Sequence, residues 1–145
     1  MLLSNALKRK NRTVKRIKEI EEDIISNNSL PTVSQREIDV EKILKERDIL
    51  VQELISLKLK IFVASEPIRE NILKIAELKS NINFLKSIST KKGIVRELCY
   101  HGSENVEYKT IIEKKEITEL IKSSEEEIDI LQEEIDKHNH TVEIE

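Results

Sequence analysis

Glycine and proline, the residues that most often interrupt helices, are scarce in this chain. Two of each occur in 145 residues, so most of the sequence can form uninterrupted helix. Aromatic residues make up 3% of the chain, and tryptophan is absent. Because large aromatic side chains supply much of the burial in a thick globular core, this composition favours an assembly of long helices.

The chain also has a single cysteine, Cys99, and no long apolar run. One cysteine excludes an internal disulfide framework and is compatible with a reducing compartment. No segment is apolar over the eighteen or more residues that a membrane helix needs, and no signal-peptide pattern opens the sequence. We therefore expect a cytoplasmic protein without integral membrane insertion.

Charged residues make up 37% of the chain and are unevenly distributed. The first twenty residues hold seven basic residues and one acid, whereas residues 113–145 hold twelve acids and four lysines. Charges along helices select partners and register, so we expect the first and last helices to pair, within a chain or between chains. The alternative is that the basic and the acidic helix faces do not pair and that both face solvent. A basic strip can also contact nucleic acid, but without interleaved aromatics nucleic acid is an unlikely partner.

Apolar residues with heptad spacing predict helices at residues 3–25, 34–63, 66–88 and 115–139. The most regular seam comprises Ile117, Ile121, Ser124, Ile128, Leu131, Ile135 and His138. The first helix carries Leu3, Leu7, Val14, Ile17 and Ile24, interrupted by Lys10. The second carries Val40, Ile43, Arg47, Leu50, Leu54, Leu57 and Ile61, widened by Leu44, Val51 and Ile55. The third carries Ile68, Ile72, Ile75, Leu78, Ile82 and Leu85. Several stripes are wider than one intramolecular partner covers, which predicts a homo-oligomer.

Turn and capping residues indicate where these helices begin. Thr32 and Ser34 are both candidate N-caps for the second helix, and Ser34 with Glu37 three residues later has the pattern of a capping box. Ser65 is a candidate N-cap for the third, with Pro67 in its first turn. A kink at Pro67 in one continuous helix is the alternative.

Residues 94–112 change character, and their β-forming side chains predict a small hairpin. Val106, Tyr108, Thr110 and Ile112 alternate along the chain, and Gly102 supplies the turn. Two strands alone are marginal in water, so this hairpin should lie on the helices or pair with a second copy. The expected fold is mainly α: an elongated antiparallel bundle or coiled coil of about four helices in one domain, residues 1–145, with the hairpin and a frayed tail at 140–145.

No catalytic or metal signature stands out, so we expect neither enzymatic activity nor a cofactor. His138 and His140 point to different sides of a helix, which makes them a weak chelating pair. Cys99 and His101 share one face of an extended strand, but no orienting third residue is identifiable. A lone cysteine is more often a small buried apolar residue.

The loop after the third helix is the best candidate for a ligand site. Its hydroxyls, cations and glycine-freed backbone N–H groups can hold a phosphate or another anion, and they belong to Ser89, Thr90, Lys91, Lys92, Gly93 and Arg96. The alternative is an ordinary helix C-terminus with lysines at its negative end and Gly93 as the C′ residue.

The order of these features resembles the septicolysin-like proteins, a bacterial family of helical hairpins. The likeness begins with Ala6 and Leu7 opening a basic helix that ends at Asn27. It continues through a helical pair and a β-prone segment to a last helix that carries Ile128, Asp129, Leu131, Gln132 and Ile135, then Asn139, Thr141 and Glu143. The chain departs from the family in lacking an acidic, proline-containing loop after the first helix and a tryptophan where His140 stands. The resemblance implies a helical oligomer of unknown role.

These observations favour a non-enzymatic, self-associating helical protein that acts by protein–protein interaction. One alternative is an oligomeric binder, or sponge, of an anionic nucleotide-like small molecule at the loop near Lys91. Another is a pore-forming or membrane-active helical hairpin.

Overall fold

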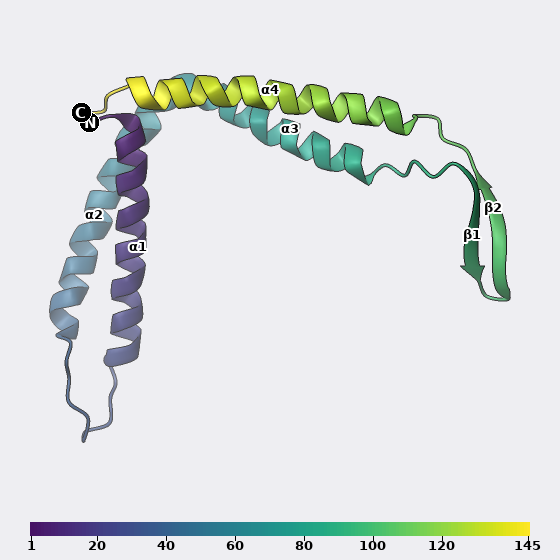
Figure 1. Cartoon of the computed structure of the whole chain (residues 1–145). Helices are drawn as coiled ribbons and strands as arrows, with labels where there is room; N and C mark the ends of the chain where they lie inside the picture. The colour runs from purple at the N-terminus through teal and green to yellow at the C-terminus, as the bar shows by residue number, and fades with distance from the viewer. The chain divides into compact units, whose positions relative to one another are not determined.

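The computed structural model describes all residues from Met1 to Glu145 and is mainly helical. Its helices are α1 (Leu3–Asn27), α2 (Val40–Ala64), the 3₁₀ helix η1 (Glu66–Ile68), α3 (Arg69–Ser87) and α4 (Lys114–Thr141). The antiparallel strands β1 (Gly93–Cys99) and β2 (Gly102–Tyr108) lie between α3 and α4 in the sequence (Figure 1). The prediction of a mainly α fold with four helices and a small β-hairpin is confirmed.

Tertiary contacts divide the chain into two compact units. Unit 1 comprises residues 1–69 and 136–145, and unit 2 comprises residues 70–135. Each unit contains an antiparallel pair of helices (Figure 1).

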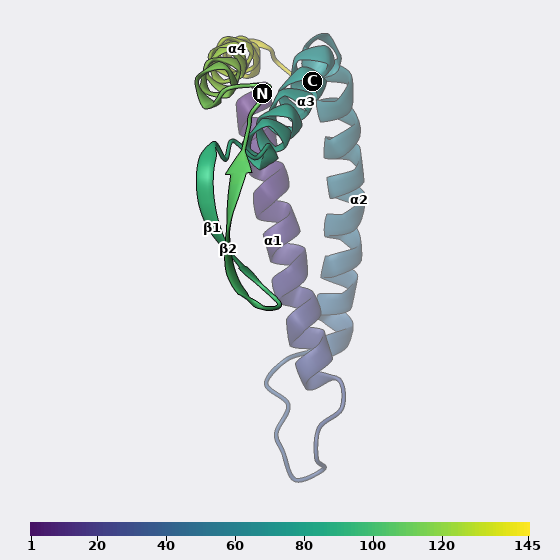
Figure 2. The same cartoon turned by 90° about the vertical axis from the view of Figure 1, so that its right-hand side faces the viewer.

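In unit 1, α1 and α2 lie side by side (Figures 1 and 2). The seam of α1 follows steps of three and four residues and consists of Leu3, Ala6, Lys10, Thr13, Ile17, Ile20, Ile24 and Asn27, all buried or half-buried. The prediction of Val14 in this seam is wrong, since its side chain is exposed. A residue of α1 is buried here because it faces α2, whatever its polarity. The polar Lys10 and Thr13 therefore also occupy seam positions.

The predicted seam of α2 is buried or half-buried throughout, from Val40 to Ile61. Its polar member, Arg47, donates from Nε and Nη2 to Oε1 of Glu21 in α1 at 2.9 and 2.8 Å. Glu21, followed by Asp48, raises the pKa of Arg47. Arg16 in α1 bonds Glu46 in α2 at 3.0 Å. The basic first helix therefore has charge partners in α2, and its pairing with the acidic α4 stays a prediction.

The start of α2 differs from the prediction. The helix begins at Val40 and not at residue 34, and the Asp39 side chain caps it by accepting a hydrogen bond from the backbone N–H of Lys42 at 3.1 Å. The backbone N–H of Ser34 instead bonds the carbonyl of Pro31, which forms a turn. Asp39 directly precedes Val40, the first residue of the seam. The capped start of the helix therefore coincides with the start of its buried side.

The Ser65 side chain makes no capping hydrogen bond, contrary to the prediction. Both Ser65 and Arg69 have right-handed helical backbone angles, and Pro67 lies in the first turn of the short helix η1 between them. The local backbone therefore stays helical through this segment, with one 3₁₀ turn at Pro67.

The C-terminal residues are ordered by contacts and are not a frayed tail. α4 continues to Thr141, and the backbone N–H of Leu3 then donates to the Val142 carbonyl at 2.8 Å. The Ile144 N–H donates to the Met1 carbonyl at 2.8 Å, and the Ile144 side chain is buried against Leu3, Ala6 and Leu57. The sequence does not predict burial of Ile144, because a single apolar residue in a polar tail has no periodicity.

In unit 2, α3 and α4 run antiparallel and side by side, and the β-hairpin extends from their joined end (Figure 1). Asn71 near the start of α3 donates to Glu134 of α4 at 2.6 Å. Within residues 114–135, only the seam residues are buried or half-buried: Ile117, Ile121, Ser124, Ile128, Leu131 and Ile135. The prediction of Ile72 in the α3 seam is wrong, because Asn71 takes that position and Ile72 is exposed.

The hairpin is shorter than the predicted span of 94–112. β2 ends at Tyr108, so Thr110 and Ile112 lie beyond the strand. Gly102 follows the two-residue turn with φ of +127°, a conformation that side-chain-bearing residues rarely adopt.

Truncating the α4 seam should destabilise the fold. Ile135 is 7% exposed and Ile130, on the same helix, is 60% exposed. We expect Ile135→Ala to lower the free energy of unfolding by about 2–4 kcal/mol, because it leaves a cavity, and Ile130→Ala to change it by less than about 0.5 kcal/mol. Urea denaturation followed by circular dichroism measures both, and equal effects would contradict the seam.

Candidate functional site

The cations of the loop after α3 are bound to side chains of the chain itself. Lys91 Nζ lies 3.3 Å from Glu97 Oε1, and Lys92 Nζ lies 3.0 Å from Glu113 Oε1. Arg96 donates from Nε to the Ser103 hydroxyl at 2.9 Å. Two of the three cations in the predicted anion site therefore already neutralise a carboxylate.

Gly93 has a different role from the helix-capping alternative. α3 ends at Ser87, whereas Gly93 begins β1 with φ of +80°. The intervening residues, including Ser89 and Thr90, belong to neither a helix nor a strand. Gly93 thus turns the chain into the strand, and it is not the C′ residue of α3.

A polar cluster forms on the face of the hairpin that carries Glu97. The Tyr108 hydroxyl of β2 donates to Oε1 of Glu97 in β1, the same oxygen that Lys91 contacts. Lys91 Nζ also lies 5.2 Å from the centroid of the Tyr108 ring. The Tyr108 hydrogen bond lowers the pKa of Glu97, helped by Lys91, and the same bond raises the pKa of Tyr108.

Lys92 and Glu113 join the two ends of the hairpin at its base. Lys92 precedes β1, and Glu113 precedes α4. Hydrogen bonding and charge attraction from Lys92 lower the pKa of Glu113. These ion pairs hold the base of the hairpin together, and an incoming anion would have to displace the carboxylates of Glu97 and Glu113.

The two glutamates make the hairpin sensitive to acid. A carboxylate whose pKa is lowered by folding stabilises the folded form above its unfolded pKa, near 4.5, and this contribution is lost as pH falls through the folded value. We expect faster amide exchange of β1 and β2 below pH 4.5, corrected for the intrinsic rate, with α1 and α2 less affected. Glu97→Gln with Glu113→Gln should abolish most of the difference, and an unchanged difference would contradict this role.

Removing the competing carboxylates also tests the anion-binding prediction. If the loop binds phosphate or a nucleotide, Glu97→Gln with Glu113→Gln frees Lys91 and Lys92 and should tighten binding about tenfold. Isothermal titration calorimetry with inorganic phosphate and ATP measures this. Heat absent from both proteins would dismiss the anion site, and Lys91→Ala with Lys92→Ala serves as the negative control.

The histidines and the cysteine do not converge. His138 donates from Nε2 to the Ala64 carbonyl at 2.8 Å, and His140 Nδ1 lies 2.7 Å from the Asp136 carbonyl. No group of three or more His, Cys, Asp or Glu side chains is arranged to hold a metal ion. Cys99 is exposed at the end of β1. The ring of the nearby His101 packs edge-on against the Tyr100 ring, with the ring centroids 6.0 Å apart.

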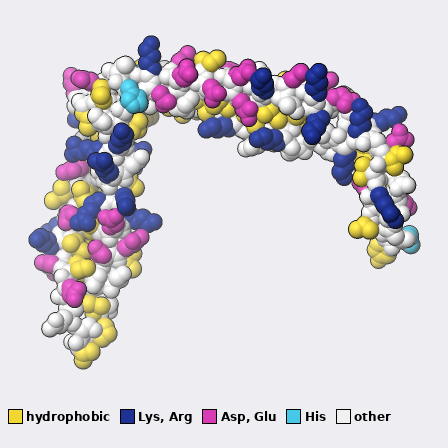
Figure 3. Space-filling model, in the orientation of Figure 1, with side chains coloured by type: hydrophobic (Ala, Val, Ile, Leu, Met, Phe, Trp, Pro, Cys, Tyr) yellow, Lys and Arg dark blue, Asp and Glu magenta, His cyan; other side chains and the backbone are white.

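The hairpin exposes apolar side chains and buries none. Ile94 is 74% exposed and Leu98 is 94% exposed on one face of β1, and Tyr100 in the turn is fully exposed. Figure 3 shows hydrophobic side chains gathered over this end of unit 2. No strand residue is buried, so the helices of the chain do not cover the hairpin, and its pairing with a second copy stays a prediction.

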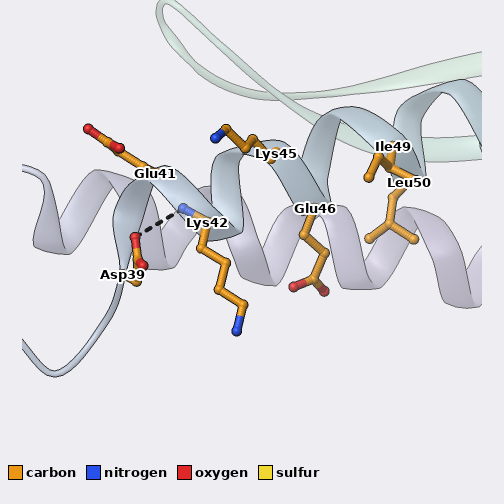
Figure 4. Close-up of a pocket in the computed structure, with 7 residues that line it drawn as sticks. All are labelled: Asp39, Glu41, Lys42, Lys45, Glu46, Ile49 and Leu50. Carbon is orange, nitrogen blue, oxygen red and sulfur yellow. Dashed lines mark hydrogen bonds between the residues drawn. The ribbon is translucent and has the colours of Figure 1, made fainter.

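Two of the shallow hollows along α2 differ in their lining. One, of about 550 Å³, lies at its start and is lined mainly by charged side chains, among them Lys45 and Glu46 (Figure 4). The other, of about 620 Å³, lies between the end of α2 and the C-terminal residues, with Leu59 and Val63 among its lining.

More large apolar residues are exposed on α2 than on any other helix. Its exposed members are Leu44, Ile49, Ile55, Leu59, Phe62 and Val63. The sequence analysis noted that Leu44 and Ile55 widen the seam, but spacing alone did not show that they lie outside the contact with α1. An exposed apolar face of this kind is typical of a protein-binding surface.

Comparison with known proteins gives no relative. The chain matches no protein-family model, no curated protein and no solved structure. None of its helices combines the length and apolar character required to cross a membrane.

Proposed function

We propose that this protein is a non-enzymatic helical module that self-associates and acts by binding other proteins. The observation that supports this most is the excess of exposed over buried apolar side chains. Thirteen apolar residues are buried, whereas twenty large apolar residues are exposed. Scattered exposed apolar residues are normal, but six of these twenty lie on the single helix α2 and three lie on the hairpin.

The location of this surface supports binding to a macromolecule. The face of α2 is a helix side of 25 residues, and the hairpin presents two strands with free edges. Such surfaces are recognised by helices that pack alongside or by added strands. A small ligand needs an enclosed pocket with convergent polar groups, which suits neither surface.

The proposal also includes a relationship to the septicolysin-like family and a cytoplasmic location. A septicolysin-like protein is expected to be a helical oligomer, which agrees with self-association. The single Cys99 suits the reducing cytoplasm. Binding of a nucleotide-like anion is the weaker alternative, because Lys91 and Lys92 each face a carboxylate.

Self-association is tested by the mass of the protein in solution. We expect size-exclusion chromatography with light scattering to give at least twice the chain mass of 16.9 kDa at micromolar concentration. The mass should fall toward one chain on dilution if the interface is of moderate size. A single mass of 16.9 kDa throughout, with full helicity by circular dichroism, would refute the proposal.

A further inference from the structure

A second row of side chains runs along α2, outside the seam that faces α1. Its members follow alternating steps of four and three residues and are Leu44, Asp48, Val51, Ile55, Lys58 and Phe62. We call this row the α2 stripe. Leu44, Ile55 and Phe62 are 46%, 48% and 62% exposed.

The α2 stripe has the geometry of a coiled-coil seam. Steps of four and three keep successive side chains on one side of a helix. At 3.6 residues per turn, the row lies about 100° around α2 from the seam with α1. A further helix can therefore pack against it without displacing α1.

The order of residues in the α2 stripe is complementary to itself. Read from either end it is apolar, charged, apolar, apolar, charged, apolar, and reversal exchanges the acid with the base. When two copies of α2 pack antiparallel, Leu44 meets Phe62 of the second copy, and Val51 meets its Ile55. In the layer between these, Asp48 meets Lys58 of the second copy. The two-fold axis repeats every contact, so the interface contains four apolar side chains from each copy and two ion pairs that lie between the central and the outer apolar layers.

The charges of the α2 stripe are accessible and select this arrangement. The Asp48 side chain is 64% exposed and contacts only its neighbour Arg47, at 3.1 Å from Nη1 to Oδ1. Lys58 makes no ion pair or hydrogen bond. A parallel pair in register would place Asp48 opposite Asp48 and Lys58 opposite Lys58, and like charges across an interface are strongly unfavourable. Antiparallel packing replaces both repulsions by attractions.

We propose that the α2 stripe is the surface through which two copies of this chain associate, by antiparallel two-fold packing of their α2 helices. This inference rests on the proposed self-association and adds its site and orientation. Apolar contacts supply the affinity, and the two ion pairs exclude the parallel arrangement.

A charge-exchange experiment tests the orientation directly. Asp48→Lys and Lys58→Asp each create two like-charge contacts and should weaken the dimer about tenfold or more. The double variant restores opposite charges and should recover the wild-type dissociation constant. Lys60→Asp makes the same charge change on the other side of α2 and should leave association unchanged. Sedimentation equilibrium measures the constants, and circular dichroism establishes that every variant is folded.

The outcomes separate this inference from the proposed function. If the wild-type protein associates but both single variants associate equally well, or the double variant stays as weak as they are, the α2 stripe is not the interface and self-association stands. If the wild type remains monomeric at about 100 µM, where a micromolar dimer would be nearly complete, both proposals fail. A dimer weakened as much by Lys60→Asp as by Lys58→Asp would also overturn the inference.

Discussion

Burial of one narrow seam per helix is the constraint on which the rest of the structure depends. Along α1 and α4, the buried and half-buried positions recur almost entirely at steps of three and four residues, and the intervening positions face water. Hydrophobic stabilisation is proportional to the apolar area removed from water, so these helices are stable only as pairs. Because each helix buries only one seam, the other apolar side chains of α2 and those of the hairpin stay exposed and available to partners.

Polar residues within the seams select how the helices align. Arg47 occupies a seam position of α2 and reaches Glu21 with two hydrogen bonds to one oxygen. Asn71 similarly bonds Glu134 from the seam of α3. Polar groups at such positions add little stability, but a shifted register would leave them unpaired, so they specify alignment.

The hairpin is held by polar contacts where the helices are held by apolar ones. None of its strand residues is classed as buried, and its order comes from the strand pairing, the Glu97–Tyr108–Lys91 cluster and the Lys92–Glu113 pair at its base. The cations that suggested an anion site in the sequence are used for this purpose. An element stabilised in this way keeps both faces accessible, which suits binding better than support of a core.

The pattern of the sequence by itself determined the helical class, the seams of α2 and α4, and the presence of a hairpin whose turn lies directly before Gly102. These features depend on local spacing and backbone preference, which neighbouring residues encode. Only the tertiary structure decided that Ala6 and Ile20 replace Val14 against α2, that Ile144 packs beside Leu3, and that Lys91 and Lys92 face carboxylates. Those outcomes depend on which side chain, distant in the sequence, lies opposite each position. The spacing of residues within one segment does not encode such contacts.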